Sequence, residues 1–144
     1  MNILKSIKIV LILFLFSLIL YSCTSSISTF NQYAYIQDTS LKVESLYLMD
    51  KAIDTFSLHL SEVKDMRLKI DKAYEFEKSR PNNSITTQIW EKIKNPDGNL
   101  FGGFLVYWQQ QGVLSPIFVQ DKKKQIGLAF DQIIELESKK IKEQ

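Results

Sequence analysis

The most restrictive feature of this 144-residue sequence is the stretch from Thr29 to Arg80, which contains neither glycine nor proline. A long stretch without the residues that interrupt regular structure is typical of helix. Its apolar side chains recur in steps of three and four, with Arg67 as the exception: Leu46, Met49, Ile53, Phe56, Leu60, Val63, Ile70 and Tyr74. This spacing follows one face of a helix. The sequence predicts one long helix over about 41–79, with a break near Ser57–Ser61 left open because weak helix formers gather there.

The width of the apolar face indicates what that helix packs against. If Leu46 occupies heptad position a, the g positions are mostly small or apolar: Ala52, His59, Met66 and Ala73. A dimeric coiled coil prefers charges on both flanks of its seam. A wide apolar face instead suits a helix packed against several neighbours. Ile53, near the middle of this face, is expected to lie in the core of a globular helical bundle.

Local signals divide the rest of the chain into shorter helices. Pro81 disfavours helix at the residue before it, and Asn95-Pro96-Asp97-Gly98 has the composition of a turn. Gly112 suits a left-handed cap, and Ser115-Pro116 is a strong helix start. These signals predict helices over about 85–94, 100–111 and 116–142. With no alternation typical of strands, the predicted fold is an all-α small helical bundle in one domain, 30–144.

The third of these helices carries an unusual concentration of large apolar side chains. Phe101, Leu105 and Trp108 belong to an apolar arc that covers about 160° of the helix at 100° per residue. One interpretation is that this helix fills the middle of the bundle, with Gly102 and Gly103 allowing a neighbour to approach closely. The other is that part of the arc is exposed and forms a partner-docking patch, for which Phe101, Leu105 and Trp108 are the candidates.

The N-terminus has the layout of an export signal. Lys5 and Lys8 precede a run of twelve residues, 9–20, that is apolar except for Ser17. This length matches the apolar region of a signal peptide, whereas a membrane-spanning helix needs about 20 apolar residues. The run ends in Leu20-Tyr21-Ser22-Cys23, and Cys23 is the only cysteine.

This ending resembles the lipobox of bacterial lipoproteins, in which an aliphatic residue stands three positions before the cysteine and a small residue directly before it. The resemblance covers residues 1–23 only, and Tyr21 departs from the small residue usual at its position. It implies that 1–22 is a signal peptide, that the Cys23 thiol carries diacylglycerol, and that 23–29 is a lipidated, polar tether to the membrane. The alternatives are an uncleaved single-pass anchor and an exported protein without lipid.

The charge balance bears on the kind of partner. The chain has 18 basic and 16 acidic residues, and two of the basic ones are Lys5 and Lys8. Without the signal peptide, 16 basic residues therefore balance 16 acidic ones. Nucleic-acid binding needs a basic face, because counterion release from phosphates provides most of the affinity. We therefore expect no nucleic-acid partner.

No motif in the sequence carries recognisable chemistry. His59 and Glu62 share a helix face, but a metal site needs more ligands than these two. The carboxylate pairs Asp50/Asp54 and Asp131/Glu135 are interspersed with lysine, as on a solvated face. Phosphate-binding loops and serine-nucleophile motifs are absent. The sequence predicts no catalytic residue, no metal and no cofactor.

Together these features predict a class of protein rather than an activity. We expect a lipoprotein held to the cell envelope through Cys23, at the outer membrane in a Gram-negative cell, with a non-catalytic helical domain that binds another envelope protein. The alternatives left open are a ligand-binding or partner-dependent enzymatic domain on the same anchor, and an uncleaved single-pass membrane protein.

Overall fold

The computed structural model describes residues 27–143 and confirms an all-α bundle. Within this range there is no strand. The α-helices are α2 (Gln32–Asp50), α3 (Leu60–Ser79), α4 (Ser84–Lys94), α5 (Phe101–Gln111) and α6 (Pro116–Lys139). Three short 3-10 helices are η1 (Lys51–Ile53), η2 (Phe56–His59) and η3 (Lys140–Glu143). The predicted signal peptide, Cys23 and the first residues of the predicted tether lie outside the described residues.

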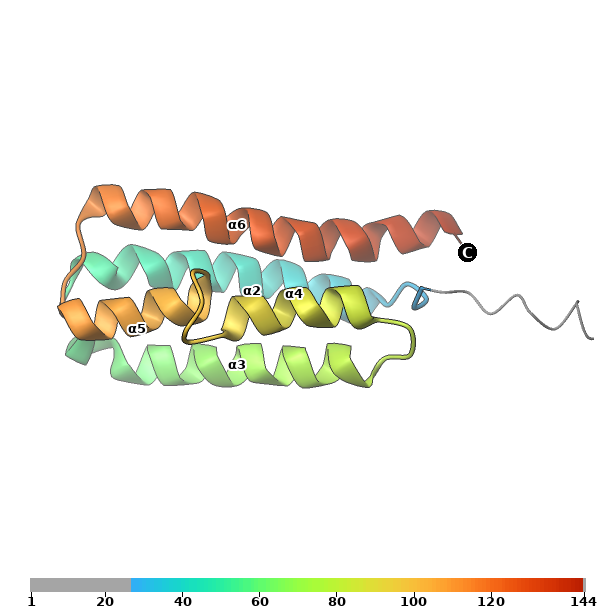
Figure 1. Cartoon of the computed structure of the whole chain (residues 1–144), viewed down its shortest axis with the longest axis horizontal. Coiled ribbons are helices and arrows are strands. Elements are labelled where there is room, and N and C mark those ends of the chain that lie inside the picture. Colours follow the sequence, from blue (N-terminus) through green and yellow to red (C-terminus); the bar gives the residue numbers. More distant parts are fainter. Residues whose placement is uncertain (1–26, 144) are drawn as a thin grey trace, which may run out of the picture.

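The helices form four parallel rods, with α4 and α5 placed end to end as a single rod (Figure 1). The chain reverses direction between successive rods, so the N-terminus of α2 and the C-terminus of α6 lie on the same side of the bundle. We call this side the terminal end; it also holds the α3–α4 connection. The opposite side, with the α2–α3 and α5–α6 connections, is called the far end.

The chain turns back between α2 and α3, so the prediction of one continuous helix over 41–79 is wrong; the break left open near Ser57–Ser61 does occur, and it begins earlier, at Lys51. Two backbone hydrogen bonds hold this turn against the α5–α6 connection: Phe56 N donates to Gly112 O at 2.8 Å, and Leu114 N donates to Ala52 O at 2.8 Å. The turn contains no glycine or proline and is built from η1 and η2. The three-and-four spacing of apolar residues runs on through the turn because α2 and α3 each bury one face in the same core.

Ile53 shows the consequence of this turn for a single residue. It was expected in the core, but its side chain is 49% exposed in η1. The prediction of burial at Ile53 is therefore wrong.

The later helix boundaries agree closely with the sequence signals. The predicted helices 85–94 and 100–111 correspond to α4 and α5, and 116–142 corresponds to α6 followed by η3. Ser115 caps α6 by accepting a hydrogen bond from Phe118 N, with Pro116 at the first helical position. Gly112 has φ of +77°, in the left-handed region that favours glycine.

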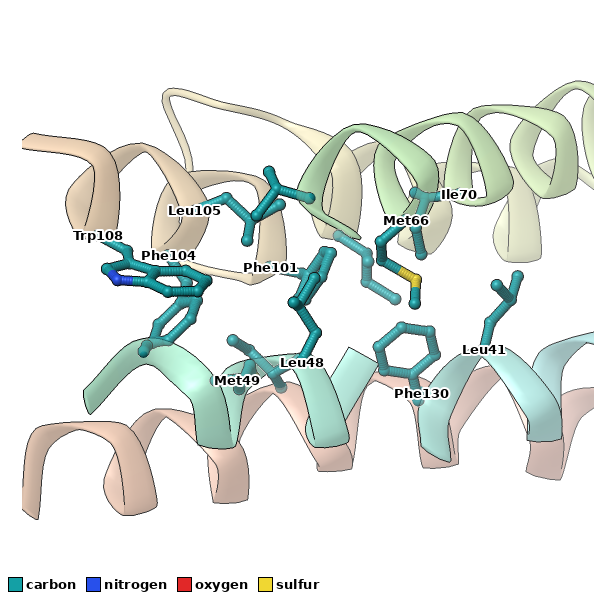
Figure 2. Packing of buried hydrophobic residues seen from close by; sticks show 14 of the residues in the cluster. Leu41, Leu48, Met49, Met66, Ile70, Phe101, Phe104, Leu105, Trp108 and Phe130 are labelled. Carbon is teal, nitrogen blue, oxygen red and sulfur yellow. The ribbon is translucent and has the colours of Figure 1, made fainter. Parts of the chain in front are cut away.

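The core lies between all four rods. Figure 2 shows side chains of α5 directed toward Leu48 and Met49 of α2, while Phe130 of α6 lies near Met66 of α3. Trp90 of α4 is fully buried and meets Phe130 edge to face, with ring centroids 5.6 Å apart. The apolar core thus joins the helices along most of the bundle.

Candidate functional site

The three residues predicted as a docking patch belong to this core. Phe101, Leu105 and Trp108 are at most 1% exposed. Trp108 also fastens the α2–α3 turn, because its indole N–H donates to Asp54 O at 3.1 Å and its ring meets Phe56 edge to face. The docking prediction is corrected: these side chains offer no surface, and the alternative that α5 fills the bundle describes them.

His59 lies beside Trp108 rather than in a metal site. Its Nε2 is 3.7 Å from the Asp54 carboxylate and its Nδ1 is 3.6 Å from the Glu62 carboxylate. Among the residues that the structure describes, no group of three or more His, Cys, Asp or Glu side chains is placed to hold a metal ion. The ring is 5.6 Å from the Trp108 ring, which suits a packing role.

Of the carboxylates in the pairs noted in the sequence, Asp50, Asp131 and Glu135 are paired with lysines, while Asp54 lies beside His59. Asp50 pairs with Lys123 and Asp131 pairs with Lys42, so both join α2 to α6. Glu135 pairs with Lys139 on its own helix. These bridges lie at the surface, where such pairs contribute about 0–1 kcal/mol each.

A buried polar cluster at the terminal end was not predicted from the sequence. We call it the terminal network: Asp38 of α2, Glu77 of α3, Glu137 of α6, and Arg80, Asn83 and Lys140. Arg80 donates to Glu77 Oε2 at 2.9 Å and to Glu137 Oε1 at 2.9 Å. Lys140 donates to Glu137 and to Asn83 Oδ1. Two cations therefore neutralise two carboxylates in the interior.

The network also holds the segment that precedes α2. Ser28 is buried, its hydroxyl donates to Asn83 Oδ1 at 2.9 Å, and its N–H donates to Asn82 O at 3.1 Å. Arg80 donates to Thr29 O at 2.7 Å, and Asn31 N donates to Glu137 Oε1 at 2.6 Å. The last residues of the predicted tether are thus bound to the bundle.

Asp38 is the unpaired member of the network. Its side chain is fully buried, and neither carboxyl oxygen has a hydrogen-bond partner. Burial, together with repulsion from Glu77 and Glu137, raises the pKa of Asp38 to about 8 against the opposing effect of Arg80 and Lys140. Asp38 therefore carries a proton at neutral pH.

Glu137 behaves in the opposite way. Burial alone would raise its pKa, but hydrogen bonds from Arg80, Lys140 and Asn31 N outweigh burial and hold the pKa below its usual value. Glu137 is therefore the ionised partner of the two cations, while Asp38 stays neutral beside it.

The far end carries several exposed apolar side chains, beside the exposed carboxylates Asp54 and Glu62. We call these apolar side chains the far-end surface: Ile53, Leu58, Val113 and Ile117, which are 49%, 76%, 51% and 78% exposed. They come from the α2–α3 turn, the α5–α6 connection and the first turn of α6, which the two backbone hydrogen bonds described above hold together. Exposed apolar side chains gathered at one end of a bundle are candidates for a contact site.

A hollow beside the α4–α5 connection is the roomiest of the described pockets. It measures about 410 Å³ and includes Tyr107, Phe118 and Lys122 in its lining. A smaller pocket of about 130 Å³ lies at the terminal end, lined in part by Ile27, Ile85 and Leu136. Both linings hold lysine but no carboxylate, whereas a pocket of about 200 Å³ lined in part by Arg67, Asp71 and Lys94 holds both charges, with Asp71 already paired to Lys94. The far-end surface is the candidate contact site because its apolar side chains are exposed.

Comparisons with known proteins add no assignment. No protein-family model matches the chain, and neither a curated protein nor a solved structure matches it. Over residues 27–143, no helix combines the length and the apolar character needed to cross a bilayer.

Proposed function

We propose that this protein is a lipid-anchored, non-catalytic module of the bacterial cell envelope that binds another envelope protein through the far-end surface. The observation that carries the proposal is the exposure of Ile53, Leu58, Val113 and Ile117 at the end opposite to the predicted anchor. In a Gram-negative cell the proposed location is the outer membrane.

The geometry of the anchor supports this orientation. Ile27, where the described chain begins, is four residues after Cys23, a distance of about 14 Å at most when extended. The 24 residues of α6 extend for about 36 Å toward the far end. A lipid on Cys23 therefore keeps the terminal end near the bilayer and holds the far-end surface away from it.

The chemistry of the far-end surface supports a protein as the partner. Leu58 lies in η2, within the turn that hydrogen bonds and Trp108 hold in place, and Ile117 lies in the first turn of α6. Rigid apolar anchors of this kind gain binding free energy when a complementary pocket removes them from water. His59, with Asp54 and Glu62 beside it, follows Leu58 in the same turn, but its ring packs against Trp108, so the proposal rests on the exposed apolar side chains.

The proposal is tested by site-specific photo-crosslinking of the full chain in its own cells. A photoreactive side chain at position 58 or 117 should give the same discrete adduct with one envelope protein. The matched controls are Leu68 of α3 and Leu128 of α6, which are 52% and 64% exposed but lie along the rods. Equal labelling at all four positions contradicts a far-end docking site. Saturable heat stabilisation by a small molecule, without an adduct, favours the ligand-binding alternative.

The anchor is tested separately with Cys23→Ser. The variant should lose incorporation of labelled fatty acid, remain unprocessed, and leave the detergent phase in detergent partitioning. A variant that stays in the membrane at the size of the wild type shows an uncleaved anchor instead.

A further inference from the structure

α2 has apolar side chains on two opposite faces. Its core face buries Ala34, Leu41, Leu48 and Met49. Its outward face carries a second series, which we call the outer stripe: Tyr33, Ile36, Ser40, Val43 and Tyr47. The four large members of this stripe are 54–65% exposed, and Ser40 is exposed at its centre. A helix that is apolar on both faces is normally covered on both.

The outer stripe follows a heptad pattern. Its members are separated by three, four, three and four residues, so at 100° per residue they fall within an arc of about 80°. A narrow a/d stripe of this kind is the seam of two helices packed side by side. A helix lying on a bilayer needs a wider apolar face bordered by lysine and arginine.

No charge interrupts the outer stripe. Between Ile27 and Leu41, Asp38 is the only charged residue type, and its side chain is buried. The charged side chains farther along α2 turn toward the neighbouring rods: Lys42 pairs with Asp131 of α6, and Glu44 pairs with Lys69 of α3. By contrast, Leu68 on the outward side of α3 has the exposed charges Lys64, Asp65 and Lys72 around it.

Two contacts fix the ends of the stripe before any partner binds. Tyr33 meets Phe76 of α3 edge to face, with ring centroids 5.2 Å apart. The Lys51 ammonium lies 5.1 Å from the centre of the Tyr47 ring. Fixed side chains lose less conformational entropy on association, which favours a specific contact.

We propose that the outer stripe is the interface with a second copy of this chain, packed in parallel so that each stripe residue meets its own counterpart. Because the stripe is uncharged, identical residues meet without like-charge repulsion. The parallel direction rests on the proposed membrane anchor. Since Ser28 and Asn31 are bound to the terminal network, only residues 23–27 remain to reach the bilayer, and these span about 14–18 Å. An antiparallel pair would place one anchor at the far end, beyond that reach.

Disulfide crosslinking of the full chain in native membranes tests the proposal. Ile36→Cys and Val43→Cys occupy equivalent heptad positions, so a parallel pair should form both the 36–36 and the 43–43 disulfide. In an antiparallel pair only residues at the two-fold axis meet their counterparts, and positions seven residues apart are separated by about 10 Å along the helix. Gln88→Cys, exposed on α4 at the front of the bundle, is the matched control. Mass spectrometry of the fragments locates each bond and separates it from a bond at Cys23.

A second comparison tests the stripe itself. In the Val43→Cys protein, Ser40→Glu should reduce the 43–43 product several-fold because two like charges would meet, whereas Ser40→Gln should leave most of it. Ser40 is exposed, so neither change should alter the thermal unfolding of the bundle.

Three results overturn the proposal. One is crosslinking at 36 and 43 no greater than at 88. Another is a 36–43 disulfide between chains, which indicates an antiparallel pair. The last is quenching of a fluorophore at position 43 by nitroxide lipids without any crosslink, which assigns the stripe to the bilayer. A failed partner adduct at the far end leaves the 36–36 and 43–43 results intact, so the two proposals fail separately.

Discussion

Asp38 places a carboxyl group without a hydrogen-bond partner inside the bundle, between two carboxylates that are already paired. Since two cations balance Glu77 and Glu137, an ionised Asp38 would be an uncompensated buried charge. The folded protein avoids this by keeping Asp38 protonated, which links the stability of the terminal end to pH.

Asp38→Asn should remove that link. The pKa of Asp38 rises from 3.8 to about 8 on folding, so the folded state binds the extra proton and loses stability as pH rises through this window. The free energy of unfolding should fall by up to about 1.4 kcal/mol for each pH unit in this window. We expect denaturant unfolding between pH 5 and pH 8 to show this loss in the wild type and a flatter profile in the variant. Asp131→Asn is the exposed control, and parallel profiles for wild type and Asp38→Asn would contradict the assignment.

Trp108 and Ile53 provide a second comparison between single residues. The sequence leaves the burial of Trp108 open and predicts burial for Ile53, whereas the structure buries Trp108 and exposes half of Ile53. Trp108→Ala should lower the free energy of unfolding by about 3–5 kcal/mol, because it empties the space between α5 and the α2–α3 turn. Ile53→Asp should change it by about 0.5 kcal/mol or less, because the side chain is half exposed. Urea unfolding of both variants checks the contrast, and a large loss at Ile53 would place it back in the core.

At the scale of elements, two glycines permit the close turn between α4 and α5. A Cβ at Gly103 would lie 1.7 Å from Gly98 O, and one at Gly102 would lie 2.2 Å from Lys94 O. Neither position leaves room for a side chain, because backbone atoms cannot move aside as a flexible side chain can. The sequence interpretation that these glycines allow a close neighbour is confirmed, and the neighbour is the end of α4.

Gly103→Ala should therefore destabilise the bundle strongly, whereas Gly127→Ala should be tolerated. At Gly127 of α6 the nearest atom to a new Cβ is Leu46 Cδ1 at 3.8 Å, an ordinary contact. Alanine should stabilise that helix by about 1 kcal/mol. Thermal unfolding of the two variants measures the difference, and similar melting temperatures would show that the α4–α5 turn adapts.

The elements also show which parts of the fold are predictable from the sequence. The boundaries of α4, α5 and α6 follow from Pro81, Asn95-Pro96, Gly112 and Ser115, whose backbone preferences act locally. The α2–α3 turn carries no such residue. It exists because Trp108, Phe56 and the α5–α6 connection hold it in place, and these are contacts between distant parts of the chain.

The same distinction applies to the candidate sites. Glu137 continues the apolar series of α6, so a single carboxylate on a buried face was a signal for the terminal network. Its partner Arg80 and the unpaired Asp38 lie far from it in the sequence and could not be assigned. The far-end surface depends on the chain reversal at residues 51–59, and a break left open near Ser57–Ser61 does not by itself say that the chain reverses there.

At the scale of the whole molecule, Arg80 joins parts of the chain that are far apart in sequence. It bonds to Thr29 O, to Glu77 of α3 and to Glu137 of α6. Arg80→Ala should lower the free energy of unfolding by about 3–5 kcal/mol, because it leaves buried carboxylates without their partner. Chemical denaturation measures this, with Arg67→Ala as the exposed control. Equal stability of the two variants would show that water replaces the guanidinium.

The attachment of Ser28, Thr29 and Asn31 to the terminal network has a mechanical consequence. A pull on the segment before Ser28 should load the bonds to Arg80 and Glu137 before it peels α2 from its N-terminus, because Thr29 and Asn31 precede that helix. Arg80 and Glu137 pass the force to α3 and α6, so the hydrogen bonds of this segment should break before α2 bears the full force. For a chain anchored at Cys23 as proposed, tension on the N-terminal end should therefore break these bonds before it unwinds α2.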